Sequence, residues 1–173
     1  DYEETATAIS VKGADFDLVF DKVYGRISSW HYQGVQVINK GPQLNFWRAP
    51  IDNDKPFRDK WYQLGLDQLQ HRIDEVNCSQ VDEKALQIVV QSRIAPPVYD
   101  IGFNCTYNYT VHGNGSVLLE VNGIPEGELP VLPKIGLQIK LPQTFNSVSW
   151  YGRGPGESYI DSKQANRVGI YNC

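Results

Sequence analysis

The feature that most constrains this chain is an alternation of apolar and polar side chains, repeated in several short runs. The clearest runs cover residues 16–20, 86–90, 107–111, 117–121 and 135–141. A period of two places every second side chain on the same face of a strand, so each run predicts a β-strand with one apolar face. Turn residues separate the runs about every ten positions, which is typical of an antiparallel sandwich.

Two of these runs carry a further signal. Asn114 and Gly115 lie between two runs and predict a tight hairpin, because Asn-Gly supplies the positive φ angles that such turns require. The run over residues 135–141 is bounded by Pro133 and Pro142, which favour its assignment as a separate strand.

One segment departs from the alternation. Over residues 57–69 the apolar side chains of Trp61, Leu64 and Leu69 are spaced as on a helix, although a glycine within the segment weakens it. The sequence therefore predicts an all-β fold, a large antiparallel β-sandwich with one short helix. We expect one sandwich domain over residues 1–173.

Composition excludes several classes of protein. The net charge is −4 and no Lys/Arg cluster occurs, so nucleic acid is not an expected partner. No apolar run approaches the roughly 18–20 residues that span a bilayer, so no membrane contact is expected. The three cysteines are widely spaced and form no Cys-x-x-Cys pair, which excludes a zinc site of that type. Because the sequence contains no methionine, we expect a chain that is processed or excised from a longer protein.

The first segment that composition does not explain covers residues 46–54, Phe-Trp-Arg-Ala-Pro-Ile-Asp-Asn-Asp. Asp52, Asn53 and Asp54 can bond to their own backbone and build a tight turn. Arg48 can clamp a carboxylate through two parallel hydrogen bonds, which would pin that turn. Two interpretations stay open: an ion-paired corner of the sandwich, or a loop that orders part of a polar site.

The second such segment covers residues 150–162 and contains three glycines and a proline, which let the backbone turn sharply after a strand. Its notable side chains are those of Trp150, Arg153, Glu157, Tyr159 and Asp161. The Gly-x-Gly-x-Gly pattern does not predict a phosphate loop, because no helix follows and no Gly-Lys-Ser/Thr is present.

Together the two segments resemble the paired signatures of the small-chain or fifth domain of family 2 β-galactosidases. That family carries an Arg-Ala-Pro-x-Asp-Asn-Asp run and, farther along, a Trp-x-Gly-x-Gly-Pro-x-Glu-x-Tyr-x-Asp run. Here these runs begin at Arg48 and Trp150, and the likeness extends over residues 16–171. Ser162 is a departure, since an Arg or Lys often follows the last Asp in the family.

The resemblance implies a supersandwich, similar to galactose mutarotase, that packs against a catalytic (β/α)₈ barrel or large subunit of the same enzyme. Retaining hydrolysis requires two carboxylates about 5 Å apart, and in this family both are glutamates on the barrel. We therefore expect no catalytic residue, metal ligand or cofactor in this chain. It is expected to be a non-catalytic docking domain of an oligomeric, cytoplasmic β-galactosidase that cleaves galactosides such as lactose and uses Mg and Na ions elsewhere.

The resemblance also implies that the segment after Asp-Asn-Asp lies near the active-site rim. Asn53, Asp54, Lys55 and Arg58 are therefore the predicted substrate-adjacent residues, which would contact sugar hydroxyls or barrel carboxylates. The alternative is a plain surface loop. The other signature residues are predicted to be structural: Arg48, Asp52, Trp150, Arg153, Glu157, Tyr159 and Asp161.

Two other functions would suit the same fold. A free-standing carbohydrate-binding module would stack sugar rings on tryptophans, and the candidates are Trp30, Trp47, Trp61 and Trp150. A mutarotase-type epimerase would need a general acid and a general base, and the candidates are His31, His71 and His112. No histidine lies in a motif that presents a partner carboxylate, and tryptophans in sandwiches more often pack in the core, so both are the weaker interpretations.

Overall fold

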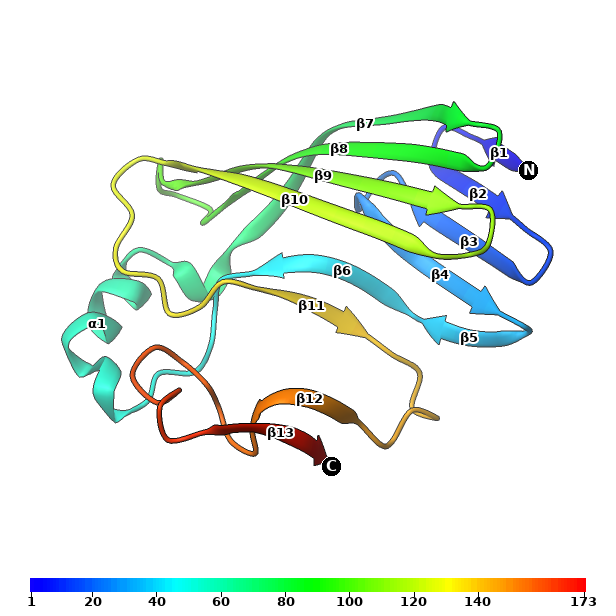
Figure 1. Cartoon of the computed structure of the whole chain (residues 1–173). Helices are drawn as coiled ribbons and strands as arrows, with labels where there is room; N and C mark the ends of the chain where they lie inside the picture. Colours follow the sequence, from blue (N-terminus) through cyan, green and yellow to red (C-terminus); the bar gives the residue numbers. More distant parts are fainter. The chain divides into compact units, whose positions relative to one another are not determined.

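The computed structural model describes all residues, 1–173, and divides the chain into two compact units, Asp1–Lys140 and Leu141–Cys173 (Figure 1). Each unit is described by itself. Strands dominate both, and no helix is long and apolar enough to cross a membrane. The predicted all-β fold with one short α-helix is confirmed. A single domain over residues 1–173 stays a prediction.

The larger sheet of the first unit has seven strands in the order β1-β2-β3-β4-β6-β11, with β5 paired to β4. These strands are β1 (Tyr2–Glu4), β2 (Ala8–Lys12), β3 (Phe16–Asp21), β4 (Arg26–Tyr32), β5 (Val35–Ile38), β6 (Lys40–Asn45) and β11 (Gly136–Lys140). Strands β1 to β4 follow one another through short turns, whereas β11 returns to pair with β6 from far along the chain. That return joins the segment after β6 to the segment before β11, where the candidate site lies.

The second sheet has four strands in the order β10-β9-β8-β7. These strands are β7 (Gln70–Asp82), β8 (Ala85–Ala95), β9 (Gly102–His112) and β10 (Val117–Glu126). The predicted hairpin joins β9 to β10, but of its two turn residues only Gly115 has a positive φ, at 85°. Asn114 acts differently, because its Oδ1 accepts hydrogen bonds from the amide and the hydroxyl of Ser116 at 3.0 and 2.8 Å.

The two sheets pack face to face through their alternating apolar side chains, which form one continuous core. The rings of Phe20 and Tyr109 meet edge to face at 5.1 Å, and those of Phe46 and Phe103 stack at 4.0 Å. The Tyr109 hydroxyl donates to the Pro42 carbonyl at 3.2 Å, so this buried polar group is satisfied. The contacts between alternating faces confirm the sandwich.

The one α-helix, α1 (Lys55–Gln63), lies between two short 3-10 helices, η1 (Asp52–Asp54) and η2 (Leu66–Gln68). It ends before the predicted boundary at residue 69, because Gly65 adopts a left-handed conformation with a φ of 67°. Trp61 of α1 is fully buried and forms a small second core with Leu66 and Ile101. This second core anchors the helix to the sandwich.

Strand β11 is confirmed, but its apolar face is not covered. Leu137 pairs with Leu44 of β6, which packs against the core, yet Leu137 is 50% exposed and Ile139 is 49% exposed. The alternation therefore predicted the strand correctly, although its apolar face remains at the surface.

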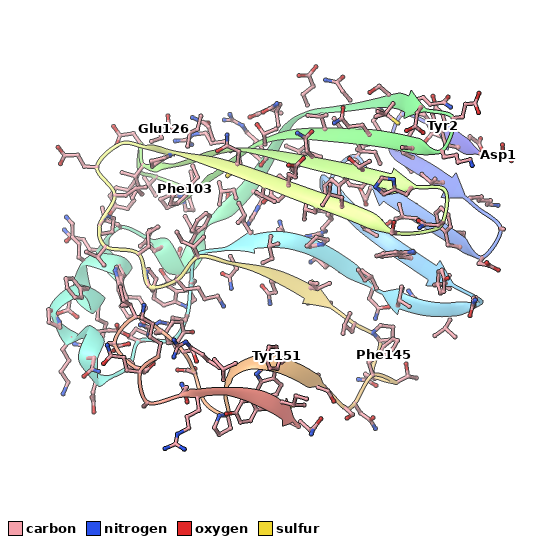
Figure 2. All side chains as sticks on the ribbon, in the orientation of Figure 1. Asp1, Tyr2, Phe103, Glu126, Phe145 and Tyr151 are labelled. Carbon is pink, nitrogen blue, oxygen red and sulfur yellow. The ribbon has the colours of Figure 1, made fainter.

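The second unit contains a two-stranded antiparallel sheet of β12 (Ser149–Gly154) and β13 (Arg167–Asn172). On one face the rings of Trp150 and Tyr171 lie 5.5 Å apart. On the other face Tyr151 pairs with Ile170, and these side chains are 80% and 74% exposed (Figure 2). An isolated two-stranded sheet is marginally stable at best in water, so this face is a candidate contact surface.

Ser92 of β8 is buried in the core, and its hydroxyl has no hydrogen-bond partner. Ser92→Ala is therefore expected to raise the free energy of unfolding by about 1 kcal/mol, because it removes an unsatisfied buried polar group. Urea unfolding measures the change. Ser28→Ala is the matched control, since the Ser28 hydroxyl donates to the Val19 carbonyl at 3.1 Å and its loss is expected to destabilise the protein. A Ser92→Ala variant less stable than the parent would contradict this expectation.

Candidate functional site

The first signature segment forms a rigid corner between β6 and α1, held by Arg48 and Asp54. The Arg48 guanidinium binds the Asp54 carboxylate through both Nη1 and Nη2, the latter at 2.8 Å from Oδ1. The Ile51 amide donates to Asp54 Oδ2 at 2.8 Å, and Asp54 is only 7% exposed. The predicted carboxylate clamp is confirmed, with Asp54 as its partner.

Electrostatics around Asp54 favour its ionised form. Its hydrogen bond from Arg48 lowers the pKa of the Asp54 carboxyl below its usual range; burial opposes this shift, and the Ile51 amide adds to it. The carboxylate is therefore charged at neutral pH and occupied by partners from its own chain.

The corner is also tied to the loop that precedes β11. Arg48 Nε donates to the Pro133 carbonyl at 2.9 Å, and Trp61 Nε1 donates to the Val131 carbonyl at 2.6 Å. Partly buried side chains from the corner, the helix and this loop pack on the second core: Trp47, Leu64, Leu69, Leu129 and Leu132. Two side-chain donors and a small core thus fix the corner against a segment about eighty positions later in the chain.

The remaining predicted substrate-adjacent residues lie on the surface. Asn53 is exposed, as are Lys55 and Arg58. Lys55 Nζ lies 3.3 Å from Asp52 Oδ1, and Arg58 Nε lies 3.0 Å from Asp59 Oδ1. Exposed ion pairs of this kind contribute about 0–1 kcal/mol, so both cations can exchange these partners for a ligand. Asp54 differs from these residues, because its buried carboxylate holds the corner.

The second signature segment organises a loop in the second unit. Arg153 Nη1 donates to the carbonyls of Lys163 and Asn166 at 2.8 and 3.2 Å, and Trp150 Nε1 donates to the Arg153 carbonyl at 3.2 Å. The side-chain NH₂ group of Asn166 donates to the Glu157 carbonyl. The backbone of Glu157 is thus held in the loop, while its side chain is exposed.

Two further residues of this signature lie within the same loop. Tyr159 is half-buried and Asp161 is exposed, and the Tyr159 carbonyl accepts hydrogen bonds from the Ser162 and Lys163 amides. The structural role predicted for the whole set of signature residues stays a prediction.

The structure shows one histidine contact that sequence reasoning missed. His31 Nδ1 lies 3.5 Å from Asp17 Oδ1 and 3.3 Å from Ser29 Oγ, because Asp17 and His31 pair directly across β3 and β4. Both neighbours meet the same ring nitrogen, so this cluster is not a nucleophile–base–acid relay. The alternation of β3 could have predicted that Asp17 faces a neighbouring strand, but not which residue it meets.

The tryptophans are used mainly for packing. Trp61 is fully buried, and Trp47 packs against it with ring centroids 6.3 Å apart. Trp30 and Trp150 are half-buried. None of the four tryptophans is among the exposed residues, which weakens the interpretation of a free-standing carbohydrate-binding module.

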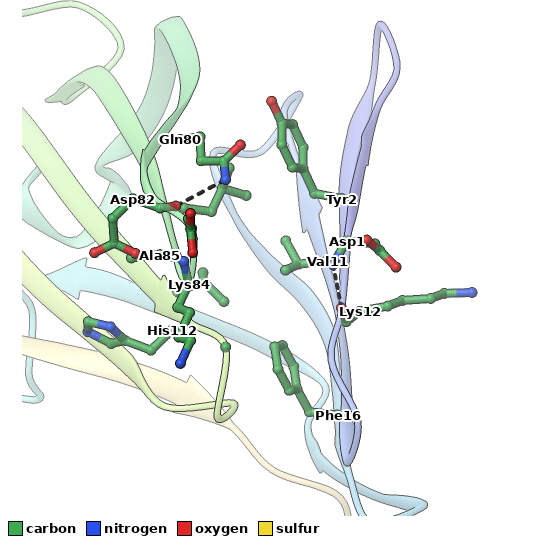
Figure 3. A pocket seen from close by; sticks show the side chains of 14 residues that line it. Asp1, Tyr2, Val11, Lys12, Phe16, Gln80, Asp82, Lys84, Ala85 and His112 are labelled. Atoms are coloured by element: carbon green, nitrogen blue, oxygen red, sulfur yellow. Dashed lines mark hydrogen bonds between the residues drawn. The ribbon is translucent and has the colours of Figure 1, made fainter.

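A cavity of about 380 Å³ opens at the end of the sandwich that carries the β7–β8 and β9–β10 turns (Figure 3). Val11 and Phe16 point into it from one sheet, and Gln80 faces Tyr2 across its mouth. None of the signature residues lines it, whereas His112, a candidate for the epimerase function, does. Helix α1 lies at the other end of the sandwich in Figure 1, so cavity and signature corner are separate features.

The resemblance implies Mg and Na ions in a whole enzyme. Among residues 1–173, no group of three or more His, Cys, Asp or Glu side chains is placed to hold a metal ion. The binding of these ions in an assembled enzyme stays a prediction.

Comparison with known proteins decides the family. The family model for the β-galactosidase small chain matches residues 12–173. The chain belongs to the β-galactosidase small-chain family. The chain is 34% identical over 172 residues to the β-galactosidase of Kluyveromyces lactis. This match covers 95% of the chain and 16% of that protein. It is 32% identical over 170 residues to the β-galactosidase of Actinobacillus pleuropneumoniae, and this match covers 98% of the chain and 17% of that protein.

A third relative, the β-galactosidase of Clostridium acetobutylicum, is 34% identical over 169 residues, covering 94% of this chain and 18% of that protein. The small chain therefore spans about a sixth of the length of these relatives. The signature corner and the second signature loop both fall inside the region matched by the family model.

Arg48→Met is expected to lower the free energy of unfolding by about 3 kcal/mol, because it leaves the buried Asp54 carboxylate unpaired. The double variant with Asp54→Leu is expected to recover most of that loss, since neither charge is then buried alone. Denaturant unfolding gives both values, and Arg58→Met, which removes an exposed ion pair, serves as the control. A single Arg48→Met variant that costs as little as the control would refute the role of the clamp.

His71 gives a pH-dependent prediction. Burial, and then the nearby Arg26 charge, lower the pKa of His71 to about 4 from 6.5. The folded state therefore resists protonation that the unfolded state accepts, so stability present above pH 6.5 is lost as pH falls towards 4. After discounting for partial solvent screening, His71→Gln should remove about 1–2 kcal/mol of this loss. Unfolding at a series of pH values tests this, and the same loss in His71→Gln as in the parent would contradict it.

Proposed function

We propose that this small chain is a non-catalytic docking and rim-shaping part of a β-galactosidase that hydrolyses terminal β-galactosides. The observation that carries the proposal is that the charged groups buried in the signature corner are bonded within the chain itself. Arg48 and Asp54, the two charges of the signature that are least exposed, bind each other and the backbone rather than facing a cleft. A residue pair used in this way positions a loop, whereas glycoside cleavage requires two carboxylates facing a sugar.

The exposed cations beyond the corner support the rim-shaping part. Lys55 and Arg58 lie in the first turn of a helix that is fixed to the sandwich through Trp61. Their only ion-pair partners are the exposed carboxylates of Asp52 and Asp59. Cationic donors on a rigid element can bind sugar hydroxyls or a carboxylate of the catalytic barrel without ordering a flexible loop first.

The docking part is supported by the exposed face of the β12–β13 sheet. Tyr151 and Ile170 pair across this face, and Val168, also exposed, lies two positions before Ile170 on β13. Contiguous exposed apolar side chains usually mark a contact surface. We propose that the catalytic barrel of the same enzyme covers it, because the small chain makes up about a sixth of its β-galactosidase relatives.

Cytoplasmic location, oligomer formation, lactose as substrate and the use of Mg and Na ions stay predictions from the family resemblance. The same holds for the substrate-adjacent position of Asn53. The carbohydrate-binding module and the mutarotase-type epimerase are the competing functions, and sugar binding or anomer interconversion by residues 1–173 alone would favour them.

Kinetics of the assembled β-galactosidase test the proposal. Arg58→Ala and Lys55→Ala are each expected to raise KM for a nitrophenyl galactoside about tenfold, since a hydrogen bond from a charged group is worth about 1.5–3 kcal/mol. Lys60→Ala, an exposed residue of the same helix, is the matched control and should leave KM unchanged. Unchanged kinetics in both variants would remove the rim-shaping role. Hydrolysis by residues 1–173 alone would refute the non-catalytic role.

A further inference from the structure

A cluster of three cations lies on the larger sheet, outside both signature segments. Lys40 of β6 pairs directly with Lys140 of β11, and Arg26 of β4 donates from Nη1 to Gln43 Oε1 at 2.7 Å. Like charges opposite each other in an antiparallel pair are destabilising. None of the three cations takes part in an ion pair within residues 1–173. The cluster therefore has no carboxylate partner within the chain, and the Arg26 guanidinium lies over the Tyr24 ring, 4.8 Å from its centroid.

A β-bulge gathers polar side chains at this place. Gln43 pairs with Gln138 and Lys40 pairs with Lys140, so β6 has one more residue than β11 between the two pairs. Directly paired residues share a face, and residues two apart in β11 share a face, so all four side chains project from the same side. Without the bulge, Lys40 would share the face of Leu44, which packs against the core.

The four side chains and Gly41 line a pocket of about 200 Å³. Gly41 has a φ of 109°, and a Cβ there would lie 2.8 Å from the Gln138 carbonyl oxygen, so the bulge requires glycine. Gln43 Oε1 is occupied by the Arg26 guanidinium, which leaves the NH₂ group of Gln43 as the free donor. The pocket thus presents two ammonium groups and amide donors, and it contains no carboxylate.

The electrostatics agree with this geometry. The Arg26 charge, then burial, then the Lys140 charge lower the pKa of Lys40. The carboxylate in register with Arg26 is that of Asp21, but Asp21 Oδ1 accepts hydrogen bonds from the amides of the following turn at 2.8 and 3.0 Å. The attraction of a bound anion to the three cations would offset the repulsion that they exert on one another.

We propose that Lys40 and Lys140, together with the side-chain amides of Gln43 and Gln138, form a binding site for a small oxyanion, and that Arg26 adds positive charge from outside the pocket lining. Phosphate, sulfate and carboxylate groups share the required chemistry, since each offers several acceptor oxygens and negative charge to clustered donors. The anion can be a free ion or an acidic side chain from another part of an assembled enzyme. This site is independent of the proposed docking function, because it includes none of the residues on which that function rests.

Thermal unfolding of the intact protein tests the site. Sodium phosphate replaces sodium chloride at constant ionic strength, and the melting temperature is recorded for the parent, Lys140→Gln and the control Lys84→Gln. Lys84 lies in the β7–β8 turn and does not line the pocket. Phosphate is expected to raise Tm by about 2–4 °C in the parent and the control, and by less than half of that in Lys140→Gln. General exclusion of phosphate from the protein surface would act equally on all three.

The same measurements distinguish the two sources of the anion. No phosphate effect, with a lower Tm for Lys140→Gln than for the parent, supports the site with an acidic side chain of the enzyme already bound. A phosphate shift of equal size in Lys140→Gln and the parent overturns the proposal. It is also overturned if phosphate has no effect and Lys140→Gln melts at the same or a higher temperature, as expected when only repulsion is removed.

Discussion

A single guanidinium, that of Arg48, connects the parts of the small chain that meet at the signature corner. Its planar set of donors reaches the Asp54 carboxylate on one side and the Pro133 carbonyl on the other. The segment of Pro133 leads into β11, which pairs with β6, and β6 leads back to Arg48. The Arg48 side chain thus connects the corner after β6 to the segment before β11, and the pairing of β6 with β11 connects the same two parts of the chain again. A lysine could not replace it, because an ammonium group lacks the fixed fork of donors.

Much of the fold could be predicted from the sequence, because alternation reports directly on burial of one strand face. It succeeded for β3, β8 and β9, whose inward side chains supply most of the core. It could not show that Leu137 stays exposed, since alternation reveals an apolar face but not whether another layer covers it. It also assigned Asn114 a positive φ, whereas that residue stabilises the turn through its side chain.

The candidate site was predictable in part. The clamp by Arg48 followed from the donor geometry of arginine and the carboxylates nearby, but the sequence could not show which carboxylate it binds. Local sequence does not reveal that the Asp54 side chain turns inward while its neighbours Asn53 and Lys55 stay exposed. The contact between Asp17 and His31 depends on strand register, which no single run of residues specifies.

The two hydrogen bonds that tie the corner to the loop before β11 depend on side chains only on their donor side. Arg48 and Trp61 both donate to main-chain carbonyls, those of Pro133 and Val131. Every residue type carries such a carbonyl, so the acceptor side of both bonds is indifferent to side-chain identity. Substitutions of the Val131 and Pro133 side chains can therefore leave both hydrogen bonds in place, whereas Leu129 and Leu132 of the same loop are constrained by their packing on the second core.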